Sequence, residues 1–195
     1  MTPINLDAFA SGQLGSKIWL CDKLEDQLDG PKTIRRLHIL GSWYGVLPML
    51  LVSRGRVSIE QVTCIDVDAE ALQVARKMND YFNWKTDSYS SVVMDVCTDQ
   101  FIEYAQANIG AQDVVINSSC EHMSSSPWFS SLAGTGAMVV LQSCNMDHKD
   151  HIAKVSHIND FKKQYPISDL KFEGEIFFDY RGPTSFTRYM LIGRC

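Results

Sequence analysis

A glycine turn between two short apolar runs constrains the fold of this chain most. Residues 37–40 and 62–65 predict strands, and residues 46–53 between them predict a helix that follows the turn Gly41–Gly45. A glycine after a strand permits a sharp turn, and the next helix then points its free N–H groups at a ligand above the turn. Asp66 follows the second run, 21 positions after Gly45. Since a carboxylate there can accept ribose hydroxyls, the segment predicts a βαβ unit that binds a nucleotide-like ligand.

The rest of the chain continues this alternation of strands and helices. Apolar periodicity and turn residues predict further helices over 69–79, 99–108, 124–132 and 158–164, and further strands over 91–94, 112–117, 136–143, 170–180 and 185–192. Alternating strands and helices indicate an α/β fold, with a mostly parallel sheet and helices on both of its faces.

The glycine turn and the acid after it resemble a known motif. Gly41-x-x-x-Gly45 followed by Cys64-Ile65-Asp66 resembles motif I and the post-motif acid of class I S-adenosylmethionine (SAM) dependent methyltransferases. This chain departs from the family at Ile39, where an acid is usual, and at Trp43, where a glycine is usual. The resemblance implies S-adenosyl-L-methionine as the cofactor, bound by Gly41, Ser42, Trp43, Tyr44, Gly45, Asp66, Val67, Asp95, Val96, Asn117 and Ser118.

The resemblance also implies the architecture. It predicts one domain over residues 1–195, a three-layer αβα sandwich whose seven-stranded sheet is mostly parallel and ends in an antiparallel C-terminal hairpin. Residues 1–30 would form an arm and a helix that cover the pocket. The helix is predicted over 10–28 because apolar residues recur there every three or four positions, at Leu14, Ile18, Cys21, Leu24 and Leu28.

The N-terminal helix begins with an unusual run of small and polar residues, 11–17. One interpretation is a lid that carries Lys17 as a cation facing the substrate, and the alternative is an ordinary solvated helix end. Trp43 also has two interpretations: it packs against the methionine end of the cofactor, or it is buried under the N-terminal helix.

The predicted strand 112–117 runs directly into the polar segment Ser118–Met123. Methyl transfer needs aligned reactants and often a base for the proton of the acceptor, and histidine, with an unperturbed pKa of ~6.5, can accept a proton near neutral pH. We therefore expect Glu121 and His122 to be catalytic. The alternative is a structural loop, in which Glu121 caps the next helix and His122 packs on the sheet.

Other polar residues at strand ends are candidates for binding the acceptor. Gln142 ends the predicted strand 136–143, and Tyr189 lies in the last strand, so both are expected to bind substrate together with Lys17. Segment 147–151 contains two histidines and two aspartates, but such a run is more typical of a solvated turn, and we expect no metal site.

Charge and composition limit the partners. The chain has a net charge of −5, which argues against a protein that coats nucleic acid. Segment 117–120 lacks the (Asp/Asn/Ser)-Pro-Pro-aromatic motif of DNA amino methyltransferases. We therefore expect a small-molecule substrate and not sequence-specific DNA. Without an apolar run of about 20 residues, a membrane span is not expected. Six cysteines without a CxxC pair suggest a reduced, cytoplasmic protein.

These observations favour a SAM-dependent methyltransferase that acts on a small molecule or an exposed polar acceptor. The altered glycine motif leaves two alternatives open. One is another SAM-using transferase, which moves an aminopropyl or aminocarboxypropyl group, and the other is a non-catalytic SAM-binding protein. An NAD-dependent oxidoreductase is disfavoured because Gly-x-Gly-x-x-Gly is absent.

Overall fold

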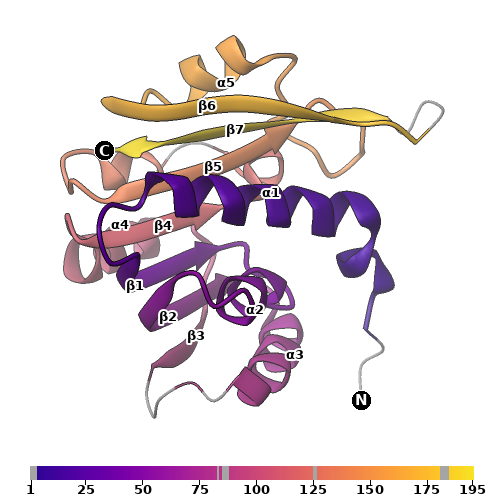
Figure 1. The fold of residues 1–195 in the computed structure, drawn as a ribbon. Coiled ribbons are helices and arrows are strands. Elements are labelled where there is room, and N and C mark those ends of the chain that lie inside the picture. Colours follow the sequence, from indigo (N-terminus) through magenta and orange to yellow (C-terminus); the bar gives the residue numbers. More distant parts are fainter. Residues whose placement is uncertain (1–3, 83, 85–87, 125–126, 181–184) are drawn as a thin grey trace.

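A seven-stranded sheet forms the centre of the molecule, with strand order β3-β2-β1-β4-β5-β7-β6 (Figure 1). The computed structural model describes residues 4–82, 84, 88–124, 127–180 and 185–195. The strands are β1 Thr33–Leu40, β2 Ser58–Asp66, β3 Tyr89–Val93, β4 Asp113–Asn117, β5 Met138–Cys144, β6 Asp169–Phe178 and β7 Phe186–Arg194.

The strand directions confirm the predicted sheet. β1 pairs in parallel with both β2 and β4, as in the register Leu37↔Val62 and Leu37↔Val114. β3 and β5 extend this parallel part, whereas β7 lies antiparallel between β5 and β6. The connection that the sequence predicts between the last two strands, residues 181–184, lies outside the described part of the chain.

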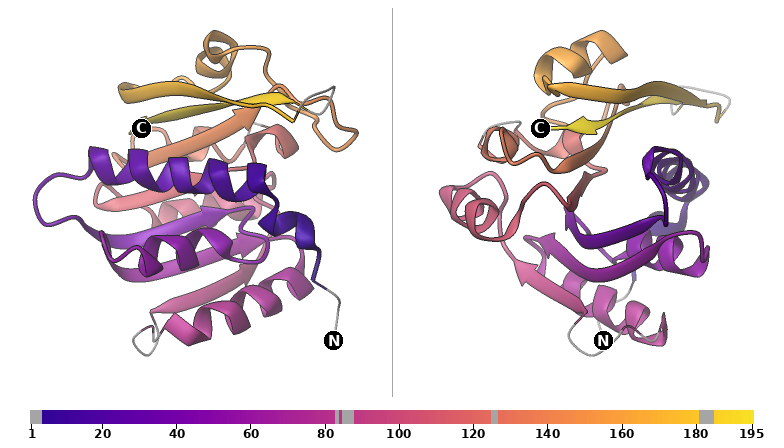
Figure 2. Two further views of the ribbon diagram at one scale, coloured as in Figure 1. Left: turned by 45° about the vertical axis from the view of Figure 1, so that its right-hand side comes forward. Right: turned by 60° about the vertical axis from the view of Figure 1, so that its left-hand side comes forward.

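Helices cover both faces of the sheet (Figure 2). α1 Ser11–Gln27, α2 Val46–Ser53 and α3 Ala69–Asn79 share one face, and α4 Asp99–Asn108 and α5 Ile158–Gln164 lie on the other. The described residues also form four 3-10 turns, η1 Leu6–Phe9, η2 Asp80–Phe82, η3 Cys120–His122 and η4 Ser130–Leu132. The structure therefore confirms the three-layer αβα sandwich.

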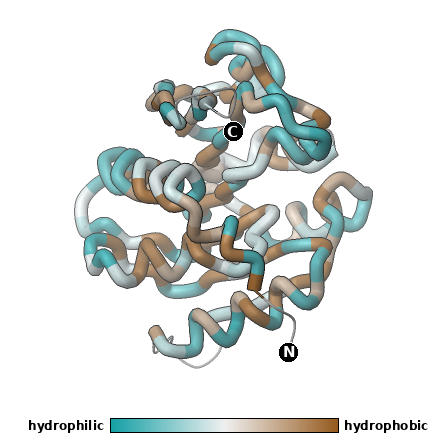
Figure 3. Tube along the Cα trace, turned by 90° about the vertical axis from the view of Figure 1, so that its right-hand side faces the viewer, coloured by the Kyte–Doolittle hydropathy of each residue, from teal (hydrophilic) through white to brown (hydrophobic). Residues whose placement is uncertain are grey.

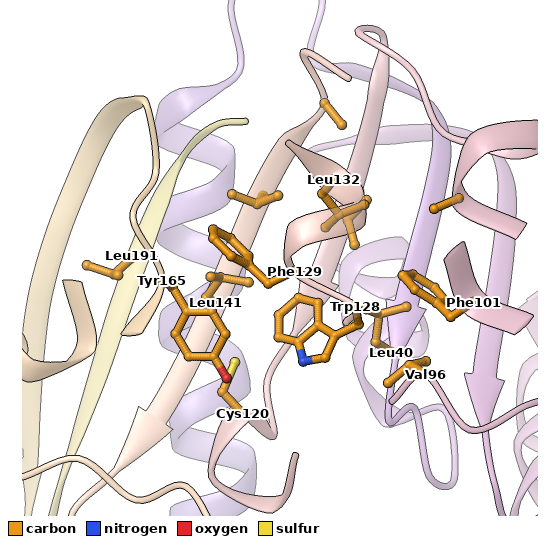
Figure 4. Close-up of a cluster of buried hydrophobic side chains, with 14 of the residues drawn as sticks. Leu40, Val96, Phe101, Cys120, Trp128, Phe129, Leu132, Leu141, Tyr165 and Leu191 are labelled. Carbon is orange, nitrogen blue, oxygen red and sulfur yellow. The ribbon is translucent and has the colours of Figure 1, made fainter. Parts of the chain in front are cut away.

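Alternation along the strands divides the hydrophobic core in two. Met138 and Val140 of β5 face α1 and α2, whereas Val139 and Leu141 face α4 and α5. Figure 4 shows the second cluster, in which the rings of three fully or nearly buried residues pack together, Trp128, Phe129 and Tyr165.

The helix predicted over 124–132 is wrong in extent. Residues 125–126 lie outside the described part, and the only regular element in the remainder is the single 3-10 turn η4. Trp128 gives a physical reason, because it is fully buried and its ring centroid lies 5.4 Å from that of Tyr165. Tertiary packing of this large side chain fixes the path of the segment more strongly than helix propensity does.

The predicted extent of α1 is confirmed, but its predicted apolar face is partly wrong. Ile18 is 40% exposed, and the buried positions include two polar residues, Ser16 and Glu25. Nε of Arg54 donates to Oε1 of Glu25 at 2.8 Å. Arg54, the residue after α2, therefore supplies a partner for a buried polar side chain of α1, and this lets the helix pack on a face that apolar spacing does not mark.

Hydrophilic residues interrupt the hydrophobic ones throughout the described trace (Figure 3). Within the described ranges, no helix is long and apolar enough to span a membrane.

Candidate functional site

A cavity of about 800 Å³ opens at the carboxyl ends of the parallel strands. One wall is formed by the turn after β1, and Asp66, the last residue of β2, lies beside that turn. The loops after β3 and β4 continue the lining. Residues of η1, α1 and the segment after β5 form the rest of it. In an open α/β sheet, this edge is where ligands bind.

The glycine turn is held by the tip of β2. Oδ2 of Asp66 accepts the backbone N–H of Trp43 at 2.7 Å, and Oδ1 accepts that of Asp68 at 3.0 Å. The Ser42 N–H donates to the Ile65 carbonyl at 3.1 Å. Each Asp66 oxygen has a second lone pair, so the carboxylate can still accept a ligand hydroxyl.

Trp43 adopts the backbone conformation of the glycine that it replaces. Its φ of 47° lies in the left-handed region, as do the φ angles of Gly41 and Gly45. Trp43 is the only residue other than glycine with a positive φ among those the structure describes. The turn thus keeps the geometry expected of a glycine motif, and the Asp66 hydrogen bond stabilises the strained residue.

Burial of the Trp43 side chain under the N-terminal segment is partly confirmed, whereas its contact with the methionine end of the cofactor stays a prediction. Its ring lines the cavity and stacks on Tyr44, with a centroid distance of 4.7 Å. It also packs against a small buried apolar cluster, against which Phe9 and Leu14 of the N-terminal segment pack as well. The Tyr44 hydroxyl accepts the N–H of Asn5 at 3.2 Å, which ties the N-terminal arm to the glycine turn.

Gly45 has a different place from the one predicted. It is not among the described residues that line the cavity; it packs beneath α3, where an added Cβ would lie 2.8 Å from Nδ2 of Asn79 and 2.9 Å from Cβ of Ala75. The Asn79 amide also donates to the Gly45 carbonyl at 3.0 Å. Glycine is needed here for close packing of α2 on α3 and for the positive φ, instead of for contact with a ligand.

Three residues predicted to bind the cofactor, Val67, Asp95 and Val96, line the cavity. Val67 and Asp95 are exposed, and Val96 is buried. Oδ1 of Asp95 accepts the Cys97 N–H at 2.8 Å and so fixes the loop after β3. The cavity lining also contains four apolar residues that were not predicted, because apolar strand and helix ends carry no signal that separates a ligand contact from core; they are Ile39, Val46, Leu47 and Met94.

Two predicted cofactor residues lie at the end of β4, and only one of them lines the cavity. Ser118 lines the cavity, as predicted, and so does its neighbour Ser119. Asn117 is fully buried, its Oδ1 accepts the Ser119 N–H at 2.9 Å, and its Nδ2 lies 3.3 Å from the Met123 sulfur. Asn117 therefore shapes the loop and is not part of the described lining.

His122 projects from η3 into the cavity lining. Its Nδ1 lies 3.0 Å from the Asp150 carbonyl oxygen. A carbonyl can only accept, so Nδ1 carries the proton, and the lone pair of the neutral ring is on Nε2. The edge of this ring meets the His151 ring at a centroid distance of 4.7 Å. The geometry presents His122 as a proton acceptor of fixed tautomer.

Glu121 is directed away from the position expected of a catalytic base. It is 2% exposed, lies outside the described cavity lining, and its Oε1 accepts from Nη1 of Arg188 at 2.5 Å. Cys144 donates to the same oxygen at 3.6 Å, and burial raises the pKa of this thiol to about 12. The reason is the register of β7, which brings Arg188 opposite Cys144 and supplies a buried cation for Glu121.

Two of the three predicted substrate residues also lie outside the described lining. Gln142 is buried, and its Nε2 donates to the Ser16 carbonyl at 3.1 Å, which joins α1 to the sheet. The Tyr189 hydroxyl donates to the Ser156 carbonyl at 2.6 Å on the opposite face of the sheet. Gln142 faces α1, and Tyr189 faces the opposite side of the sheet. Each side chain therefore positions a neighbouring segment, and neither lines the cavity.

Lys17 does line the cavity, as predicted. Its ammonium donates to Oε1 of Gln13 at 2.7 Å, one helical turn earlier. Burial, reinforced by repulsion from Arg188, lowers the pKa of Lys17 to about 8. The lining also includes residues that were not predicted to bind a ligand. They are Asn5, Asp7, Ala8, Gln13, Cys97, Met123, Ser124 and Ile152.

Segment 147–151, considered above for metal binding, contributes His148 and Asp150 to the cavity lining. Its Asp147 pairs with Lys154. Within the described chain, a compact set of potential ligands is formed by Glu121, Cys144 and His151. The Arg188 guanidinium already bonds the Glu121 oxygen of this set, and Nδ1 of His151 bonds the Met146 carbonyl, so hydrogen bonds account for these groups.

Comparison with known proteins identifies the fold. No protein family model matches the chain, and no curated protein sequence does. Among solved structures, TrmK of M. capricolum in complex with S-adenosyl-homocysteine is similar, with a TM-score of 0.57 and 13% identity over 89% of this chain and 67% of that one. A SAM-dependent methyltransferase from Agrobacterium tumefaciens gives a TM-score of 0.58 and 13% identity, over 93% and 61%.

Geranyl diphosphate methyltransferase in complex with SAM gives a TM-score of 0.63 and 11% identity, over 93% of this chain and 85% of that one. The chain therefore has the fold of class I SAM-dependent methyltransferases, as the sequence resemblance implies. It spans about two thirds of the length of the first two of these structures.

Proposed function

We propose that the protein is a SAM-dependent methyltransferase that acts on a small-molecule or exposed polar acceptor. The observation that carries this proposal is the Asp66 carboxylate at the tip of β2, which faces a cavity of about 800 Å³ while it holds the Trp43 turn. The same cavity also contains His122, so a nucleotide-binding edge and a proton acceptor share one space.

The residues present fit the cofactor. Asp66 retains acceptor capacity for two ribose hydroxyls, and Asp95 is an exposed carboxylate suited to the exocyclic amine of adenine. Met94 and Val96, both largely buried, provide apolar surface for the base. The Ser118 and Ser119 hydroxyls and the Trp43 ring would surround the methionine end.

His122 is the residue that we assign to proton transfer. SAM, when bound, supplies a methyl group that is electrophilic because it is attached to a sulfonium. A hydroxyl or ammonium acceptor must lose a proton to attack it, and Nε2 of His122 takes that proton while the Asp150 carbonyl keeps Nδ1 protonated. Glu121, paired with Arg188, holds η3 in place and thereby positions His122.

The acceptor is proposed to be small. The N-terminal arm, α1 and the segment after β5 cover the cavity, and this leaves room for a compact ligand beside the cofactor. The net charge of −5 disfavours extended contact with the DNA backbone, and we propose neither a DNA nor a membrane partner. A reduced, cytoplasmic location is consistent with six cysteines that are all free thiols.

Calorimetry with SAM, S-adenosyl-homocysteine and NAD tests the cofactor. We expect both sulfur nucleosides to bind and NAD not to bind. Binding of NAD alone would exclude the proposal. Product analysis then separates the reactions, because methyl transfer yields S-adenosyl-homocysteine, whereas transfer of an aminopropyl or aminocarboxypropyl group releases methylthioadenosine. A protein that binds SAM tightly but forms neither product with any acceptor tested would be a binding protein.

A further inference from the structure

Lys17 is a half-buried cation in the cavity that lacks a carboxylate partner. Among the residues that the structure describes, no acid lies within 4.0 Å of its ammonium, and its only hydrogen bond there goes to the neutral amide of Gln13. An ammonium carries three N–H donors, so this bond leaves donors for a ligand. A charge removed from water without a counterion is unfavourable unless a ligand supplies one.

The groups around Lys17 do not neutralise it. Glu121 and Arg188 are 2% and 4% exposed and pair with each other, so their charges cancel within one buried ion pair. Asp7 also lines the cavity, but its carboxylate is exposed to solvent. The depressed pKa of Lys17, about 8, agrees with this lack of compensation, since burial is its main cause and repulsion from Arg188 adds to it.

The buried ion pair also has spare hydrogen-bonding capacity. Arg188 reaches Glu121 through Nη1 alone, and its buried Nε has no hydrogen-bond partner within the described ranges. The Lys17 ammonium therefore lies beside a buried ion pair whose own charges cancel, and it adds a positive charge that no described carboxylate neutralises. The unpaired Lys17 ammonium is therefore the group in this part of the lining that an anion can contact.

We propose that Lys17 binds a carboxylate or phosphate group of the methyl acceptor, so that the acceptor is a small acid whose nucleophilic N–H or O–H faces His122. This inference rests on the proposed methyl transfer and adds the class of substrate to it. Lys17 and His122 come from separate elements, α1 and η3, and line one cavity. An acid anchored at Lys17 is thereby oriented for attack.

The test uses inorganic phosphate and acetate as probes on the protein saturated with S-adenosyl-homocysteine, followed by NMR. We expect each anion to bind and to raise the pKa of Lys17 from about 8 toward its ordinary value of 10.5. Lys17→Met should weaken anion binding about tenfold or more, as expected for a charge-assisted hydrogen bond, and Lys17→Arg should retain most of it. Lys23→Met is the matched control, because Lys23 lies on the same helix but pairs with Asp26 at 3.3 Å.

Three results would overturn the inference. The first is that neither anion binds the loaded protein, and the second is that Lys17→Met, folded as judged by its melting temperature, binds them as the wild type does. The third is that Lys17→Met loses affinity for S-adenosyl-homocysteine, and that S-adenosyl-homocysteine displaces the anions from the wild type. Lys17 would then bind the carboxylate of the cofactor and not that of the acceptor. Calorimetry with S-adenosyl-homocysteine is done first. If S-adenosyl-homocysteine does not bind, the proposed function fails and the inference with it; if it binds, the anion experiments test the inference alone.

Discussion

The backbone N–H of Trp43 donates a hydrogen bond of 2.7 Å to Oδ2 of Asp66. This contact joins the turn after β1 to the tip of β2, and it holds a tryptophan at a φ of 47°, where glycine is the ordinary residue. The same carboxylate is our candidate for the ribose. In the proposed function, Asp66 would therefore couple cofactor binding to the strained turn.

Substitutions at Trp43 should separate backbone strain from side-chain contacts. Both Trp43→Gly and Trp43→Ala remove the stacking on Tyr44, but only glycine tolerates the left-handed conformation without strain. We expect Trp43→Gly to be more stable than Trp43→Ala by about 1 kcal/mol in urea unfolding. Equal stabilities would mean that the turn relaxes when the indole is lost.

Asp66→Ala should weaken binding of SAM by more than ~1 kcal/mol, because it removes a charged acceptor of ligand hydroxyls and the support of the turn. Asp68→Ala is the control. Oδ1 of Asp68 accepts the N–H groups of Glu70 and Ala71, so this residue caps α3. Its loss should lower the free energy of unfolding by about 1 kcal/mol and leave affinity for SAM nearly unchanged. Calorimetry that shows normal SAM affinity in Asp66→Ala would move the ribose site elsewhere.

His122→Ala should lower kcat by roughly 10²- to 10⁴-fold while the calorimetric affinity for SAM stays close to that of the wild type. The reason is that the Nε2 lone pair acts on the acceptor and not on the cofactor. Retained kcat in this variant would remove His122 from the proton-transfer step.

Glu121→Gln provides the contrast, because Glu121 supports η3 from outside the described cavity lining. It leaves Arg188 buried without its counterion, and loss of one partner of a buried ion pair costs about 3–5 kcal/mol. We expect a large loss of stability in this variant and recovery of part of it in the double variant Glu121→Gln with Arg188→Met. A stable but inactive Glu121→Gln would instead indicate a direct role in the reaction.

His38 should make the protein sensitive to acid. Its side chain is 2% exposed, and burial lowers its pKa to about 4, below the ~6.5 of an unfolded chain. Between these values the unfolded state binds a proton that the folded state does not, so stability falls as pH drops from about 6.5 to 4. The loss is on the order of 3 kcal/mol. Urea unfolding of the wild type and His38→Gln at pH 7 and pH 4 measures it, and parallel losses in the two proteins would contradict the assignment.

Local chemistry predicted much of the fold. The helices over 46–53, 69–79, 99–108 and 158–164 appear with the predicted bounds, since each has an apolar period or a cap that depends on nearby residues, as Asp68 shows for α3. The helix predicted over 124–132 failed, because burial of Trp128 against residues distant in sequence decides that path.

The sequence by itself determined that a glycine turn and Asp66 meet at one edge of a parallel sheet, because strand polarity and glycine backbone freedom are local properties. Only the tertiary structure decided which polar residues face the cavity there. Glu121, Gln142 and Tyr189 looked equivalent to His122 and Lys17 along the chain, but sheet register and the packing of α1 bury them against other partners. Orientation at a strand end depends on neighbours far away in sequence, and so on the assembled fold.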